Sequence, residues 1–100
     1  MRYNMFMIVI DRLIWDEKNR AHIARHDVSI SEVEEVCHNH PVFISGHSGR
    51  LMVIGPSDSG KALSVVLDPK DGKGMWYVVT ARSADRKERS LYTTMKGVSL

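Results

Sequence analysis

The chain has 100 residues, of which 43% are hydrophobic and 26% are charged, and its formal net charge is +2 at pH 7. These values are typical of one small globular domain, here residues 1–100, with a modest hydrophobic core. The charge is compatible with an anionic partner but is too weak to establish one. The single cysteine, Cys37, excludes an internal disulfide and favours a reducing compartment. We expect it to pack as a small apolar side chain.

The first apolar run, Met5–Trp15, predicts a strand, with Asp11 and Arg12 as a break or a solvent-facing pair. The run is too short to span a bilayer, and it lacks the apolar region and cleavage site of a signal peptide. Cytoplasmic residence is therefore expected. Residues 1–12 are interpreted in part as an extension of the domain.

A helix is expected next, capped by Asp16 and ending near His26. Within it, Asn19, His22, Ile23 and His26 recur at helical spacing and share one face. That face is too polar for a plain core stripe. We therefore expect its histidines to be hydrogen-bonded inside the fold or to line a site.

A second helix is expected after Asp27, which stands where a left-handed residue ends the first. Ser29 or Ser31 would cap it, and Glu34 would complete a capping box with Ser31. Pro41 would stop it. Its expected inner face consists of Val33, Val36, Cys37 and His40.

The rest of the chain has a β pattern followed by one more helix. Four apolar runs separated by Gly, Ser, Asp and Pro predict an antiparallel meander. These runs are Val42–Ser45, Leu51–Gly55, Ala62–Leu67 and Met75–Thr80. The fold class is then α+β, with order β-α-α-β-β-β-β-α and the helices packed on one face of an antiparallel sheet.

The last helix is expected to begin at Ser83 as N-cap, with Asp85 in its first turn. Its apolar side would carry Ala84, Leu91, Tyr92 and Met95, and its basic side Arg86, Arg89, Thr93 and Lys96. Glu88 projects into the apolar side. A buried carboxylate is costly without a partner, so Glu88 is expected to have a cationic or hydrogen-bonding partner or a raised pKa.

The sequence suggests three kinds of site. His22 and His26 at i, i+4 are compatible with zinc, as are His38 and His40, but the sequence has neither HExxH nor a CxxC partner for Cys37, so no metal or other cofactor is expected. The segment 55–61 is only faintly like a phosphate loop, because it joins two strands, and it is interpreted as a hairpin turn. The third is a metal-free phosphodiester site.

Cleaving RNA without a metal requires a base for the 2′-hydroxyl, cations for the phosphorane and a proton donor for the leaving oxygen. The residues that supply these groups are Arg82, Arg86, Arg89, Glu88, Tyr92 and the histidines of the first helix. The alternative is that Glu88 has a structural ion pair and that the arginines are solvated.

Several blocks of the sequence resemble BrnT-like toxins, small RelE-superfamily proteins of bacterial type II toxin–antitoxin pairs. The blocks run in order through Leu13–Asp16, Asn19 with His22–Ile23, His26, Val28, Glu32–Val36, Gly49–Arg50, Val53–Gly55, Leu63–Val66 and Thr80–Tyr92. The likeness covers roughly Leu13–Met95. The sequence departs from the usual family pattern at Arg25-His26-Asp27, where Lys-His-Gly is common, and at His22, where many members carry Asn.

The resemblance implies a RelE-like sheet, an endoribonuclease that inhibits translation, and neutralisation by a DNA-binding antitoxin of ribbon-helix-helix or helix-turn-helix type. By position, it implies a site at Arg50, Arg82, Glu88, Arg89 and Tyr92. We take as catalytic candidates Arg82, Glu88, Arg89, Tyr92 and His26, and as substrate-binding candidates Arg50, Arg86 and His22. The alternatives are a non-catalytic interaction domain with the toxin fold and an RNA-binding module without cleavage.

Overall fold

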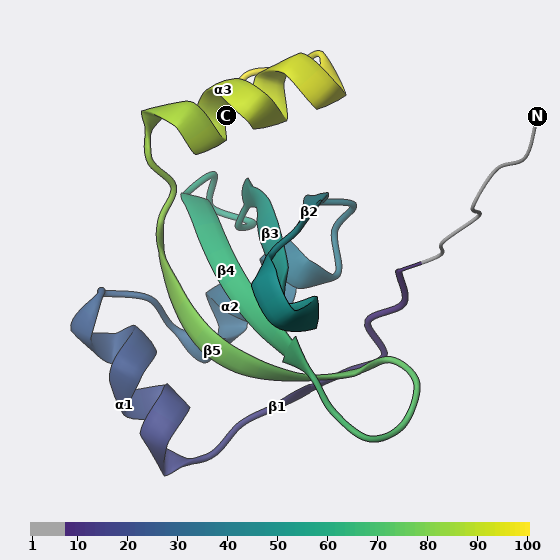
Figure 1. The fold of residues 1–100 in the computed structure, drawn as a ribbon. Coiled ribbons are helices and arrows are strands. Elements are labelled where there is room, and N and C mark those ends of the chain that lie inside the picture. The colour runs from purple at the N-terminus through teal and green to yellow at the C-terminus, as the bar shows by residue number, and fades with distance from the viewer. Residues whose placement is uncertain (1–7) are drawn as a thin grey trace, which may run out of the picture.

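The computed structural model describes residues 8–100, so the start of the expected strand Met5–Trp15 lies outside this range. The elements in chain order are β1 (Arg12–Ile14), α1 (Glu17–Arg25), α2 (Ile30–Cys37), β2 (Val42–Ser45), a short 3-10 turn (His47–Gly49), β3 (Leu51–Pro56), β4 (Ala62–Pro69), β5 (Met75–Ser83) and α3 (Arg86–Lys96) (Figure 1). The α+β class and the predicted element order are confirmed. Within residues 8–100, no helix has the length and apolar content needed to cross a bilayer.

The five strands form one sheet in the order β1-β5-β4-β3-β2. Strands β2 to β5 form the expected antiparallel meander. The expectation of a wholly antiparallel sheet is wrong, because β1 pairs with β5 in parallel. A parallel neighbour needs a long connection, and here the two helices and three intervening strands provide it.

The helices do not all pack on one face, which corrects the second part of the fold expectation. The inner face of the sheet, which includes Leu51, Val53 and Val65, shares a core with residues of α1 and α2. The alternate residues, such as Ile54, form the outer face and pack with Tyr92 of α3. Figure 1 shows α3 across one end of the sheet, away from α1.

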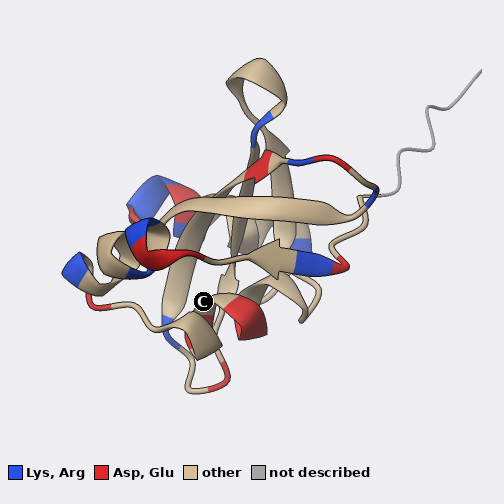
Figure 2. Ribbon diagram, turned by 90° about the horizontal axis from the view of Figure 1, so that it is seen from below, with Lys and Arg blue, Asp and Glu red and all other residues tan. Residues whose placement is uncertain are grey.

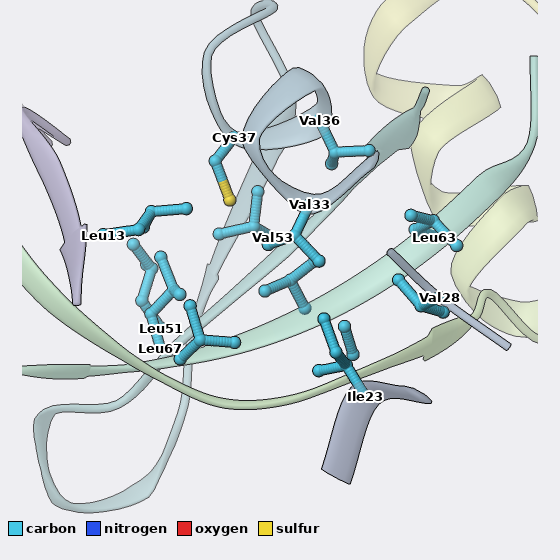
Figure 3. Packing of buried hydrophobic residues seen from close by; sticks show 13 residues of the cluster. Leu13, Ile23, Val28, Val33, Val36, Cys37, Leu51, Val53, Leu63 and Leu67 are labelled. Carbon is cyan, nitrogen blue, oxygen red and sulfur yellow. The ribbon is translucent and has the colours of Figure 1, made fainter. Parts of the chain in front are cut away.

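The inner core is closed mainly by branched aliphatic side chains. Figure 3 shows Val33 and Val36 of α2 above Val53, with Ile23 of α1 at one side. All four are at most 1% exposed. Cys37 is 4% exposed and packs in the same cluster, which confirms its expected apolar role.

One β-bulge sets which residues of β5 reach the outer face. Val66 of β4 pairs with Thr80, whereas the next residue, Leu67, pairs with Val78, so Val79 is an extra residue on β5. A bulge reverses the alternation of side chains beyond it. Because of the bulge, Ala81 is buried in the inner core and Arg82 lies on the outer face.

Capping side chains set the helix starts: one is as expected, one is the first of two expected serines, and one differs from expectation. Asp16 caps α1 as predicted. Ser29 rather than Ser31 caps α2, and its capping-box partner is Glu32 rather than Glu34. Ser83 does not cap α3, because β5 continues through it and Asp85 is the N-cap.

Fewer residues of α2 and α3 are buried than the sequence predicted. His40 is exposed in the loop after α2, with a positive φ of 51°. On α3 only Glu88 and Tyr92 are buried, whereas Leu91 is 37% and Met95 59% exposed. The helix lies over the end of the sheet, so one turn of its apolar side makes contact and the rest is exposed.

Candidate functional site

The outer face carries three rows of side chains across the sheet, read from the strand register. The row under α3 consists of Val42, Ile54, Ser64 and Arg82. The next row, which we call the open strip, consists of Ile44, Met52, Val66 and Thr80 and is half-buried. The third row consists of Arg50, Asp68 and Tyr77. The open strip therefore lies between Arg82 on one side and Arg50 on the other.

At the α3 end, Arg82 and Glu88 form a two-pronged ion pair. Nη1 and Nη2 of Arg82 each donate to one carboxylate oxygen of Glu88 at 2.8 Å. The backbone N–H of Asp85 donates to the same carboxylate at 2.8 Å, and the Ser64 hydroxyl donates at 3.3 Å. Glu88 is only 9% exposed, so the expectation that it has a cationic partner is confirmed.

These contacts decide the protonation of Glu88. Burial raises the pKa of its carboxyl group, but the hydrogen bonds from Arg82, Asp85 and Ser64 lower it by more. The net pKa therefore lies below its usual value. Hydrogen bonding to Glu88 also raises the pKa of the Arg82 guanidinium. Glu88 is thus a stable anion at neutral pH, better suited to positioning Arg82 than to accepting a proton. Its role as the base stays a prediction.

At the opposite end of the outer face lies a pocket of about 240 Å³. We call it the cationic pocket; the residues used below are Lys18, His22, Arg50, Asp68, Lys70 and Tyr77. Nε of Arg50 lies 3.5 Å from Oδ1 of Asp68, and both side chains are partly exposed. Nζ of Lys70 lies 5.4 Å from the centre of the Tyr77 ring, a cation–π distance.

Helix α1 is fixed beside this pocket by two contacts to the β5 side. The buried amide of Asn19 donates to the carbonyls of Ile14 and Val78, at 2.9 and 3.0 Å, where β1 ends and no longer pairs with that edge of β5. The Tyr77 hydroxyl donates to Asp16. Partial burial and this carboxylate raise the pKa of Tyr77, which keeps the hydroxyl protonated. His22 is consequently held at the pocket wall.

The structure divides the predicted site residues into two groups. Arg82 and Glu88 are in contact at the α3 end, and Tyr92 is buried beside them in the α3 core. Arg86 and Arg89 are exposed on α3. His22 and Arg50 line the cationic pocket instead.

The two groups are separated along the sheet. Asp68, at the pocket, follows Ser64, at the α3 end, by four residue steps, which corresponds to about 13 Å of strand. His26 lies on α1 with its ring edge-on to that of His22, 5.4 Å between centres, and it is exposed. The residues that the sequence analysis assigned to a single site therefore lie at two ends of the outer face.

Four pocket residues were missed from the sequence: Lys18, Asp68, Lys70 and Tyr77. Lys18 could have been found, because it precedes His22 by four residues and so shares its helix face. Tyr77 pairs with Asp68 across the β4–β5 hairpin. That register depends on the bulge at Val79, which no local pattern in the sequence indicates.

Among residues 8–100, no three His, Cys, Asp or Glu side chains are grouped so as to hold a metal ion. Figure 2 shows positive and negative residues interspersed over the ribbon. Any anion site must therefore depend on a local cluster, such as the cationic pocket, and not on the field of a whole basic face.

No protein-family model matches this chain, and no curated protein matches it.

Proposed function

We propose that the chain is a toxin-like, metal-independent endoribonuclease of a toxin–antitoxin pair, which acts in the cytoplasm and inhibits translation by cleaving RNA. The observation that carries the proposal is the open strip on the outer face, with the Arg82–Glu88 pair at one end and the cationic pocket at the other. The likeness of the sequence to BrnT-like toxins supports the same reading, as does the α+β order of elements.

The outer face has the features that single-stranded RNA requires. Phosphates bind to arginine and lysine, and unpaired bases lie against apolar surface. The open strip supplies half-buried Ile44, Met52 and Val66, and cationic groups stand on both sides of it. An extended strand of RNA laid from α3 to α1 would place phosphates at both ends and bases over the strip.

The groups at the α3 end have distinct proposed roles. Arg82, whose side chain is 41% exposed, binds a phosphate, and Glu88 holds its guanidinium in place. Arg86 and Arg89, exposed on α3, bind the flanking backbone. Tyr92 supports the helix from the core, where it is 7% exposed.

The test is expression of the chain alone in bacteria together with cleavage of RNA by the pure protein. We expect arrested growth and cut RNA from the unaltered chain, and loss of both in Arg82→Ala. Arg20→Ala, at an exposed position of α1, is the matched control and should behave like the unaltered chain. Full RNA cleavage by Arg82→Ala would remove Arg82 from the site, and a chain that neither cuts RNA nor arrests growth would contradict the function.

A second candidate function, a non-catalytic interaction domain, is favoured by one observation. Leu91, Met95 and Val98, on α3 and just beyond it, are 37%, 59% and 57% exposed. Exposed apolar side chains grouped on one helix are typical of a protein-binding surface. In the toxin proposal this surface would bind the antitoxin, whereas in the alternative it would be the whole function. Expression of the chain without growth arrest, together with capture of its neighbouring gene product, would favour the alternative.

A further inference from the structure

The cationic pocket has the size of a small anion site. Its volume of about 240 Å³ equals about eight water molecules at roughly 30 Å³ each. That is room for a phosphate group with part of its ribose. The pocket lies on the outer face, at the end of the open strip, so a strand of RNA on the strip would reach it.

The fixed charges of the pocket favour an anion. Lys18, Arg50 and Lys70 are positive, and Asp68 is the one carboxylate of the lining, which leaves an excess of +2 in the lining (three minus one). A second carboxylate, Asp16, accepts from the Tyr77 hydroxyl beside the pocket and reduces the local excess to +1 (three minus two). The contact with Asp68 engages Nε of Arg50, and the Arg50 side chain remains 48% exposed. A guanidinium that is this exposed can still donate hydrogen bonds to a phosphate oxygen while it contacts Asp68.

His22 adds an imidazole to the wall of the pocket, and imidazole is the side chain that most often serves as a general base in catalysis. It is half-buried, and it faces Lys18 and His26 from its own helix. On the sheet side of the pocket it faces Arg50, Asp68, Lys70 and Tyr77. The Glu88 carboxylate, by contrast, already accepts four hydrogen bonds.

We propose that the cationic pocket is the reaction centre of the ribonuclease, with a phosphodiester bound by Lys18, Arg50 and Lys70 and with His22 as the general base. This rests on the proposed function and moves the chemistry from the α3 end to the α1 end. Arg82 then binds a phosphate away from the cleaved bond.

The chemical step balances with the residues present. His22 takes the proton of the ribose 2′-hydroxyl, and the 2′ oxygen forms a bond to phosphorus. The bond from phosphorus to the 5′ oxygen breaks, and that oxygen takes a proton from the Lys18 ammonium group. The products are a 2′,3′-cyclic phosphate and a 5′-hydroxyl end. Arg50 and Lys70 stabilise the added negative charge of the phosphorane.

The test compares His22→Ala with His38→Ala, an exposed histidine at the C-terminal end of α2 and outside the cationic pocket, in the full chain. We expect His22→Ala to slow RNA cleavage by at least about 100-fold. We expect its binding of a non-cleavable 2′-O-methyl RNA to change by less than about twofold, because His22 is not one of the phosphate-binding cations. Lys18→Arg, which keeps the charge, should bind RNA normally and cleave it slowly.

The possible outcomes separate this proposal from the function. Cleavage by His22→Ala at the rate of His38→Ala would overturn the reaction centre and leave the ribonuclease function intact. Failure of the unaltered chain to cleave RNA would overturn the function, and the catalytic role of His22 with it. Titration with inorganic phosphate, followed by NMR, should shift the ring signals of His22 and not those of His38. The absence of that shift would overturn phosphate binding in the pocket.

Discussion

At the scale of single residues, the most informative feature is a buried carboxylate whose partner the sequence did not identify. The helical pattern alone showed that Glu88 faces the apolar side and must be paired. It did not choose among Arg82, the other arginines and the histidines, because the choice depends on where β5 ends. Arg82 is selected because the bulge at Val79 turns its side chain onto the face that α3 covers.

The pair makes stability depend on pH in a specific way. Glu88 has its usual pKa of 4.5 when the chain is unfolded and a lower pKa when it is folded, so the unfolded state binds more protons between the two values. The contribution of the pair is present above 4.5 and is lost as pH falls through the folded pKa. We expect Glu88→Gln to lower the free energy of unfolding by about 2 kcal/mol at neutral pH.

Urea unfolding of the unaltered chain and Glu88→Gln, at several pH values from neutral to acid, measures this. The difference between the two proteins should shrink in acid. Glu17→Gln, exposed in the first turn of α1, is the control and should change stability little. A difference between the unaltered chain and Glu88→Gln that is constant with pH would show that the pair does not carry the effect.

Cys37 gives a second prediction at this scale. Burial, and then the Glu34 carboxylate, raise the pKa of its thiol to about 12, and the side chain is 4% exposed. The thiolate needed for alkylation is therefore scarce and shielded in the folded protein. Iodoacetamide should label Cys37 in urea and leave it unlabelled in buffer, as intact mass would report. Rapid labelling of the folded chain would contradict the packing of α2.

At the scale of elements, the sequence predicted which segments form helices and strands far better than where they start. All three helices were expected from caps and periodicity, but the cap of α3 was expected two residues too early, at Ser83, and the choice between Ser29 and Ser31 for α2 was left open. The reason is that several Ser and Asp residues precede α2 and α3 at capping distance. For α3 the capping-box rule makes the choice, because Asp85 has Glu88 three residues later whereas Ser83 has Arg86. For α2 the rule does not decide, because Ser29 is followed by Glu32 and Ser31 by Glu34 at the same spacing, and the structure selects Ser29.

The two serines before α2 form a matched pair for testing this. Ser29 accepts a hydrogen bond from the backbone of Glu32, and its own N–H donates to the Glu32 side chain. Ser29→Ala should lower the free energy of unfolding by about 1 kcal/mol. Ser31→Ala, inside the helix, should be neutral or slightly stabilising. Thermal unfolding by circular dichroism reports both, and the reverse order would place the cap at Ser31 instead.

At the scale of the whole molecule, the meander and the α+β class could be predicted because they follow from short turns and alternation. Three features could not. The parallel pairing of β1 with β5, the position of α3 on the outer face and the bulge at Val79 are all long-range outcomes. As a result, candidates grouped in the sequence as one site lie at two ends of the outer face.

The two-ended arrangement predicts how RNA affinity depends on salt. Each phosphate contact contributes about −0.7 to the slope of log K against log salt for single strands. Lys18→Ala and Arg82→Ala should each reduce the slope by about that amount. Lys73→Ala, on an exposed turn outside the cationic pocket, should leave it unchanged. Fluorescence anisotropy with a 2′-O-methyl RNA measures these slopes. Identical slopes for all four proteins would place RNA somewhere other than the outer face.

The most direct measurement is the chemistry of the ends left on single-stranded RNA after incubation with the pure chain in the presence of EDTA. Metal-independent attack by the 2′-hydroxyl predicts 2′,3′-cyclic phosphate and 5′-hydroxyl ends, formed at the same rate with and without the chelator. Intact RNA, or 5′-phosphate and 3′-hydroxyl ends whose formation EDTA abolishes, would contradict the assignment of this fold and its outer face to metal-free RNA cleavage.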